Sequence, residues 1–191
     1  IHFDSLGRPI YAVSDYGGGK TAAVRSESDL TGRLSKMFDQ AQREVASGFV
    51  GMAGTPIVGD SAEKGRRWTF QNVLGALVKT WDEHGRQFRA EYDNLHRPIS
   101  AFVQQAGQAE ILFNYVVYGD HLGPATAQTL NLLGTTHLIF DQAGMVRVPQ
   151  LDFKGNPKSV DRILAKDYKN DLDWSALPGQ ADVAAIQVNA D

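Results

Sequence analysis

The sequence contains no cysteine among its 191 residues. This absence excludes a disulfide framework, thiol catalysis and cysteine-ligated zinc, although it does not fix the compartment in which the protein works. No Gly-x-Ser-x-Gly nucleophile motif is present, and none of the five histidines forms a His-x-x-x-His pair around a Glu. We therefore expect no catalytic residue, no metal ligand and no cofactor.

Long apolar runs and an excess of one charge are also missing. The chain is 42% hydrophobic and 21% charged with a net charge of -3, as in ordinary globular proteins of one domain. Its basic residues are scattered, so we expect no nucleic-acid partner, and no segment is apolar enough to predict a membrane span. The chain begins at Ile1 without an initiator Met or a signal peptide, which predicts an excised or processed piece.

A short repeated unit is what the sequence does contain. An aromatic residue precedes an Asp, and a Gly often follows three residues after the Asp. Asp before a turn accepts backbone N–H groups, and Gly supplies a positive φ without steric cost. Copies recur ten or eleven residues apart, as from Asp82 to Asp93, which is typical of short strands joined by tight turns. The sequence therefore predicts a mainly β fold of tandem antiparallel β-hairpins.

The turn residues that we expect to be structural belong to strong and weak copies of this unit. They are Asp4, Gly7, Asp39, Asn72, Gly75, Asp82, Gly85, Asp93, Asp141, Gly144, Asp152 and Gly155. Catalytic carboxylate pairs face one pocket, whereas an Asp that recurs at every turn is spread over the structure. The accompanying aromatic residues Phe3, Phe38, Trp81, Tyr92 and Phe140 either fill a core or stack on sugars.

Two other motifs fail on inspection. The run Gly17-Gly18-Gly19-Lys20-Thr21 resembles the end of a phosphate-binding loop, but Ser14 stands where that motif needs its first Gly. Asp167, Asp171 and Asp173 lie close together, but Leu172 stands where a calcium loop needs Gly. These segments predict a hairpin turn and a solvated helix end.

Three segments interrupt the rhythm of turns. Residues 46–65 hold five Gly and a Pro, which predicts a loop between hairpins. Residues 124–132 predict a short helix with Pro124 in its first turn and Gly134 beyond its end. Residues 160–171 predict a second helix, because Ser159 can cap it and Val160, Ile163 and Leu164 share one face. We expect one domain over residues 1–177 and a loosely ordered tail over residues 178–191.

An ordered set of motifs carries a resemblance to a known family. Tyr92-Asp93-Asn94-Leu95-His96-Arg97-Pro98 resembles the YD repeat of RHS-repeat proteins. The chain as a whole is similar to the RHS region of insecticidal toxin complex B-subunit-type and SpvB-like toxin proteins over residues 3–177. The further segments that carry this similarity are Phe3-Asp4-Ser5-Leu6-Gly7-Arg8-Pro9, Arg67-Trp68-Thr69-Phe70-Gln71-Asn72, Trp81-Asp82-Glu83-His84-Gly85, Val117-Tyr118-Gly119-Asp120, Phe140-Asp141-Gln142-Ala143-Gly144, Asp152-Phe153-Lys154-Gly155-Asn156 and Asp173-Trp174-Ser175.

The resemblance implies a β-sheet strip that spirals into a hollow shell around a toxic polypeptide. This chain would be a wall segment without catalytic residues, secreted or extracellular as part of its parent protein. Its implied partners are the remainder of the parent RHS protein, an encapsulated toxin domain and other toxin-complex subunits. The alternative is an extracellular carbohydrate-binding or cell-surface adhesion module built from YD repeats. Gln42 and His96 replace the usual turn Gly, which predicts a different backbone geometry at those two turns.

Overall fold

The computed structural model describes residues 1–178, so all but the first residue of the tail predicted at 178–191 lies outside the described residues. Fourteen strands follow one another through the sheet in the order of the sequence, which confirms the predicted mainly β fold. The chain divides into two units, Ile1–Gln87 and Phe88–Asp191, which are described separately below.

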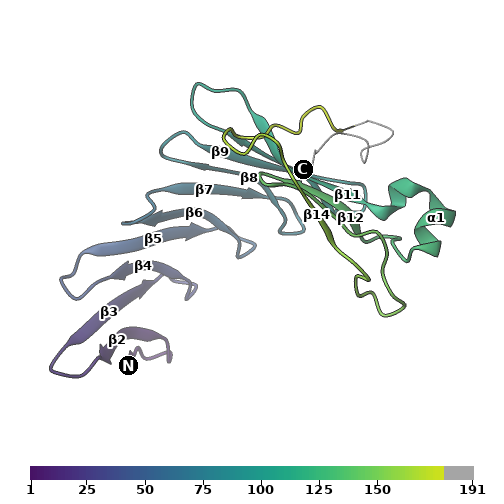
Figure 1. Cartoon of the computed structure of the whole chain (residues 1–191). Helices are drawn as coiled ribbons and strands as arrows, with labels where there is room; N and C mark the ends of the chain where they lie inside the picture. Colours follow the sequence, from purple (N-terminus) through teal and green to yellow (C-terminus); the bar gives the residue numbers. More distant parts are fainter. Residues whose placement is uncertain (179–191) are drawn as a thin grey trace. The chain divides into compact units, whose positions relative to one another are not determined.

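The first unit consists of hairpins in which each strand pairs antiparallel with the next (Figure 1). Its strands are β1 (His2–Phe3), β2 (Pro9–Asp15), β3 (Thr21–Ser28), β4 (Leu34–Phe38), β5 (Glu44–Val50), β6 (Pro56–Ser61), β7 (Arg67–Gln71) and β8 (Leu77–Asp82). Because each strand pairs with the next, successive corners lie alternately at one end of the strands and at the other.

The first unit has almost no hydrophobic core. Ala23 is its one buried hydrophobic residue, whereas Phe49 and Phe70 are 74% and 58% exposed. An antiparallel sheet normally buries one face, but the face of this single layer that carries Phe49 and Phe70 stays exposed. Strand pairing and contacts at the corners therefore hold this unit together.

The loop predicted over residues 46–65 is wrong, because strands β5 and β6 occupy most of that segment. Gly48 pairs with Gly59 across this hairpin. A Cβ on Gly48 would lie 3.0 Å from the carbonyl oxygen of Val58, so the two backbones approach closely there. Gly48 thus permits a tight strand contact and does not mark a loop.

The second unit combines a sheet with two short helical segments. Its strands are β9 (Gln87–Tyr92), which begins at the unit boundary, β10 (Pro98–Gln104), β11 (Ile111–Tyr118), β12 (Thr136–Asp141), β13 (Gly144–Arg147) and β14 (Asp161–Leu164). Between β11 and β12 lie the 3-10 helix η1 (Gly119–Leu122) and the helix α1 (Pro124–Thr129), which Figure 1 shows beside the ends of these strands. Neither helical segment of residues 1–178 is long and apolar enough to cross a bilayer.

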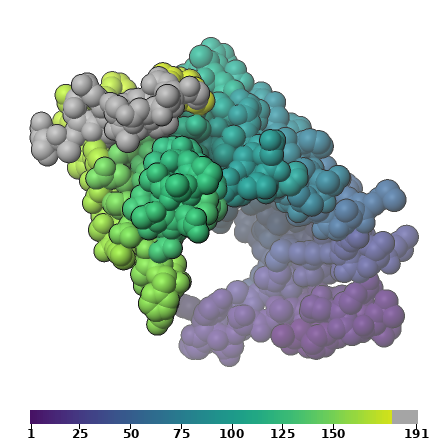
Figure 2. Space-filling view, turned by 90° about the vertical axis from the view of Figure 1, so that its right-hand side faces the viewer, coloured from purple at the N-terminus to yellow at the C-terminus, as the bar shows by residue number. Residues whose placement is uncertain are grey.

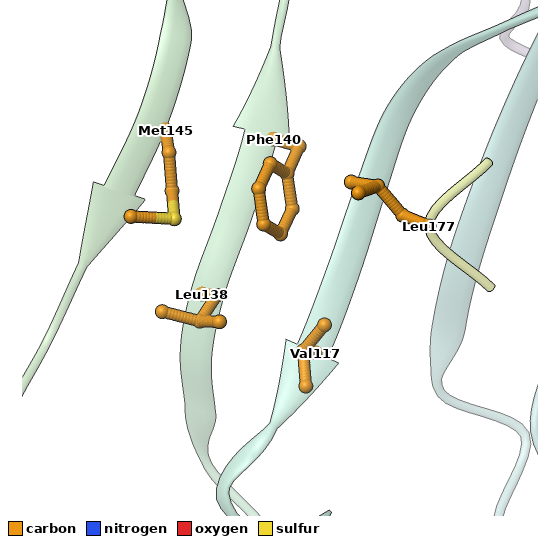
Figure 3. Packing of buried hydrophobic residues seen from close by; sticks show 5 residues of the cluster. All are labelled: Val117, Leu138, Phe140, Met145 and Leu177. Carbon is orange, nitrogen blue, oxygen red and sulfur yellow. The ribbon is translucent and has the colours of Figure 1, made fainter. Parts of the chain in front are cut away.

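A hydrophobic core lies on one face of β11, β12 and β13. Phe140 and Leu138 are fully buried on β12, and Val117 and Met145 pack from the neighbouring strands (Figure 3). The fifth member, Leu177, comes from outside the sheet and points toward Phe140. This core is therefore closed by a segment that is distant in sequence.

We call residues 172–177 the strap. The carboxylate of Asp173 accepts the N–H of Leu112 at 2.9 Å, and the N–H of Trp174 donates to the carbonyl of Leu112 at 2.9 Å. The indole N–H of Trp174 donates to the Asp141 carbonyl at 3.1 Å, and its ring lies 5.2 Å from that of Phe140. The strap thus binds backbone groups of the sheet and covers its apolar face.

Of the two predicted helices, one is confirmed and one is wrong. The helix predicted at 124–132 is present as α1, which ends three residues early at Thr129. Residues 161–164 of the helix predicted at 160–171 instead form β14, paired with β13. Of its presumed apolar face, Ile163 packs against the core while Val160 and Leu164 stay exposed, so strand pairing prevails over a helical pattern.

Candidate functional site: the hairpin corners

The corner at Asp4 shows how the repeated unit folds. The N–H of Asp4 donates to the carbonyl of Arg8 at 2.9 Å, and the N–H of Gly7 donates to the carbonyl of Asp4 at 3.0 Å. One carboxylate oxygen of Asp4 also accepts the N–H groups of Leu6 and Arg8, each at 2.9 Å. With Gly7 at φ 76° this is a tight turn followed by a left-handed bulge residue. The side chain thereby satisfies N–H groups that the strand pairing leaves free.

The same backbone pattern recurs at corners at both ends of the strands. An Asp or Asn side chain accepts the N–H four residues ahead at Asp4, Asp29, Asp39, Asn72, Asp82, Asp93 and Asp152. At each of these corners the backbone N–H of the same Asp or Asn donates to the carbonyl of that fourth residue. Asn72 shows that the pattern needs the oxygen and not the negative charge.

The third residue after each corner Asp adopts a left-handed backbone whether or not it is Gly. Gly75 has φ 79°, and Gln42 and His96 have φ 60° and 59°. The different geometry predicted for Gln42 and His96 is therefore wrong. A non-Gly residue pays a steric cost in this region, and the hydrogen bonds of the corner hold it there.

Arginine four residues after the corner Asp is a feature that the sequence reading missed. Arg8, Arg43 and Arg97 each bond back to their own corner Asp through the guanidinium group. Arg97 also donates to Asp120 of η1 at 2.7 Å and stacks 3.9 Å above the Tyr118 ring. Arg33 instead donates to the carbonyl of Gly51 at 2.8 Å, in the next corner at the same end of the strands. The recurrence of Arg at this offset was the signal available in the sequence.

The corner carboxylates are held ionised by these bonds. The backbone N–H of Arg8 is the main reason that the pKa of Asp4 lies below its ordinary value. At Asp93, burial acts to raise the pKa, but the backbone and guanidinium groups of Arg97 outweigh it, so the pKa is lowered. Acids with lowered pKa values remain charged at neutral pH and are unsuited to donate protons.

The corner at Asp141 differs from the others. Asp141 pairs directly with Gly144 across a two-residue loop, and its carboxylate accepts the N–H of Ala143 at 2.8 Å. Arg162 of β14 donates to both carboxylate oxygens of Asp141, at 2.8 and 2.7 Å. A Cβ on Gly144 would lie 2.2 Å from the carbonyl oxygen of Ile163, so β14 leaves room only for Gly. This corner is built to admit β14.

The predicted turn residues do not converge on a pocket. Each lies at a corner of its own hairpin, and the Asp, Glu and His residues within 1–178 form no cluster that could hold a metal ion. A surface depression of about 350 Å³ lies over β4 and β5, where two of its charged groups, Lys36 and Glu44, bond each other at 2.8 Å. The arrangement supports hairpin geometry and offers no convergent reactive groups.

Solved structures share this fold, whereas no protein-family model and no curated protein matches the sequence. TcdB2-TccC3 matches with a TM-score of 0.78 and 19% identity over 90% of this chain and 9% of that chain. TcdB2-TccC3 without its hypervariable C-terminal region gives the same values. The Photorhabdus luminescens Tc holotoxin pore matches with a TM-score of 0.79 and 19% identity over 91% of this chain and 9% of that chain. The chain thus spans less than a tenth of these proteins, and the predicted resemblance is confirmed at the level of the fold: the chain has the fold of a section of the Tc toxin proteins.

Proposed function

We propose that the chain is a non-catalytic wall segment of an RHS β-shell that encloses a toxic polypeptide in a larger, secreted, toxin-related protein. The observation that carries this proposal is the match to TcdB2-TccC3 over 90% of the chain at a TM-score of 0.78. The neighbours include the Tc holotoxin pore and a form without a hypervariable C-terminal region, which makes toxin-complex subunits and a passenger domain the proposed partners.

The physical properties of the first unit support a wall. A single layer whose one buried hydrophobic residue is Ala23 gains little from a core and must be stabilised by strand pairing and by contacts between its corners. Corner bonds such as those of Arg33 to Gly51 provide such stabilisation from one hairpin to the next. Alternation along each strand gives the layer two chemically separate faces, which an enclosing wall needs. We propose that residues 1–177 form one continuous segment of that kind and that the corner residues have a structural role.

Protease protection of the passenger tests the proposal. The full-length parent protein is digested under native conditions, and the polypeptide that it carries is expected to survive longer than the same polypeptide made alone. Arg97→Ala removes the guanidinium group that joins the Asp93 corner to Asp120, and should shorten that survival. Arg43→Ala is the matched control, because the Arg43 side chain is 79% exposed and bonds only its own corner. Equal digestion of enclosed and free passenger would refute the wall.

A carbohydrate-binding module is the second candidate, and one observation favours it. The rings of Trp68 and Trp81 lie nearly parallel with centroids 6.4 Å apart, and Trp81 is 37% exposed. Flat aromatic rings offer a surface on which the apolar face of a sugar can stack. A glycan array that shows no binding to the chain would exclude this candidate, and binding lost in Trp81→Ala would support it.

A further inference from the structure

A buried histidine on β12, His137, meets an exposed histidine, His121, in the second unit. His137 on β12 is 7% exposed, and the ring of His121 on η1 meets it edge to face with centroids 5.8 Å apart. Neither residue belongs to a hairpin corner or to the core around Phe140. The corner geometry and the proposed wall therefore leave this pair unexplained.

The hydrogen bond of His137 identifies the ring atom that would take up a proton. Its Nδ1 lies 2.9 Å from the carbonyl oxygen of Val148, which can only accept, so Nδ1 carries the hydrogen. In the neutral ring, Nε2 then holds the free electron pair. The N–H of Val148 donates to the carbonyl of His137 at 2.9 Å, so the two residues are joined by two bonds.

The charged groups around His137 oppose its protonation. Burial is the main reason that the pKa of His137 lies below its ordinary value. The hydrogen bond to the Val148 carbonyl acts to raise this pKa, and His121 and Arg147 act to lower it, so that the net pKa is lowered. Asp161 of β14 is bound to Arg147 at 2.7 Å, and Asp120 of η1 is bound to Arg97 at 2.7 Å. Helix α1 has no charged residue, and the titratable residues of β11 are the tyrosines Tyr115 and Tyr118. No carboxylate is bonded to His137 in the described part of the chain.

The link between His137 and Val148 helps to hold a small structure that we call the cap. The cap comprises residues 119–135 with the segment 148–151, and Figure 2 shows the region around residue 125 as a rounded, green knob on the surface of the second unit. Leu132 is fully buried in it, and the N–H of Leu151 donates to the carbonyl of Leu130 at 3.0 Å. Segment 148–151 thus links His137 to residues 119–135.

We propose that the cap is an acid-sensitive element, released from β12 when His137 takes up a proton. A positive charge on the buried ring would face His121 and Arg147 without a counter-ion, and the ring would be more stable in water. The unfolded form binds the proton more readily than the folded form, so the stability of the cap rises with pH and is lost as the pH falls below the range of a free imidazole.

Hydrogen exchange of the whole chain tests the proposal at about pH 7.5 and about pH 5, after correction for intrinsic exchange rates. Protection of the amides of Leu132, Val148 and Leu151 is expected to fall at the lower pH, while protection in β4 and β5 stays constant. His137→Asn keeps an N–H donor for the Val148 carbonyl but cannot ionise, so it should remove the pH dependence. His84→Asn is the matched control, because His84 is 73% exposed at the Asp82 corner.

Two outcomes of the hydrogen-exchange experiment would overturn the proposal. One is protection of the cap that does not change with pH in the unaltered chain, and the other is an unchanged response in His137→Asn. If His137→Asn does not fold, an NMR titration of the unaltered chain decides. A His137 ring that titrates clearly below the free value of about 6.5 supports the acid-sensitive cap, and one that titrates at or above it refutes the cap.

Discussion

At the scale of single residues, the left-handed position of each corner is the most demanding site in the chain. Gly75 meets this demand without strain because it has no Cβ. Nothing lies within 4 Å of the place where a Cβ would stand, so a substitution there would meet no packing clash. His96 adopts the same backbone at φ 59° with a side chain. The two residues therefore allow the backbone cost to be measured separately from packing.

Gly75→Ala is expected to lower the free energy of unfolding by about 1–2 kcal/mol, because Ala is strained at positive φ. His96→Gly is expected to raise it by a few tenths to about 1 kcal/mol, since relief of strain is partly offset by a more flexible unfolded chain. Denaturant unfolding measures both. Gly59→Ala is the control, since Gly59 has ordinary φ and open space, and a loss there as large as at Gly75 would contradict the explanation.

At the scale of elements, the strap completes a core that the strands leave open. Leu177 is 1% exposed and contacts a cluster whose other members all lie on β11, β12 and β13. Its anchor, the bond from Leu112 to Asp173, joins residues 61 positions apart. The stability of the second unit therefore depends on a segment without regular secondary structure.

Leu177→Ala is expected to destabilise the second unit by about 2–5 kcal/mol, the usual cost of deleting a buried leucine side chain. The denaturation midpoint followed by tryptophan fluorescence checks this, because Trp174 lies 5.2 Å from Phe140. Leu164→Ala, at a site 61% exposed, should change the midpoint little. Equal effects of the two substitutions would show that the strap is dispensable.

The elements also show how far the sequence could predict this fold. Corners such as Asp82 with Gly85 were predictable, because an Asp acceptor and a left-handed Gly are local requirements. Strand β14 was not, because the apolar spacing of Val160, Ile163 and Leu164 fits a helix, and pairing with β13 decides between the two. The strap was hidden for a similar reason: a contact between Leu112 and Asp173 leaves no periodic pattern in the sequence.

At the scale of the whole molecule, many carboxylates share one electrostatic state. Asp4, Asp29, Asp39, Asp82 and Asp93 all have lowered pKa values because they accept hydrogen bonds at corners. A lowered folded-state pKa means that the unfolded chain binds protons more readily in acid. The corners are therefore coupled to pH as a group.

We expect the stability from the corner carboxylates to be complete above about pH 4 and to be lost progressively as the pH falls further. Thermal unfolding midpoints measured from neutral to acidic pH check this. Asp93→Asn, which keeps the oxygen acceptor as Asn72 does, should reduce the slope in this acidic range. A midpoint that does not change with pH in this range would contradict the assignment.

Exposed aromatic side chains on one face of the first unit predict self-association of the isolated chain. Phe49 and Phe70 are 74% and 58% exposed on a layer without a core. Light scattering should show that the average mass rises with concentration, and Phe49→Thr with Phe70→Thr should reduce the rise. Tyr168→Thr, at an 81% exposed site in the second unit, is the control. A stable monomer at high concentration would contradict this prediction.

Because corners alternate between the two ends of the strands, such a chain can change in length only in certain ways. Removal or duplication of one strand would reverse the direction of every later strand and move every later corner to the opposite end of the strands. Removal or duplication of two strands keeps each corner at the same end of the strands. An arginine such as Arg33 can then still reach the next corner at that end. Insertions and deletions accepted during evolution should therefore come as whole hairpins, so that the number of strands in the sheet changes in steps of two.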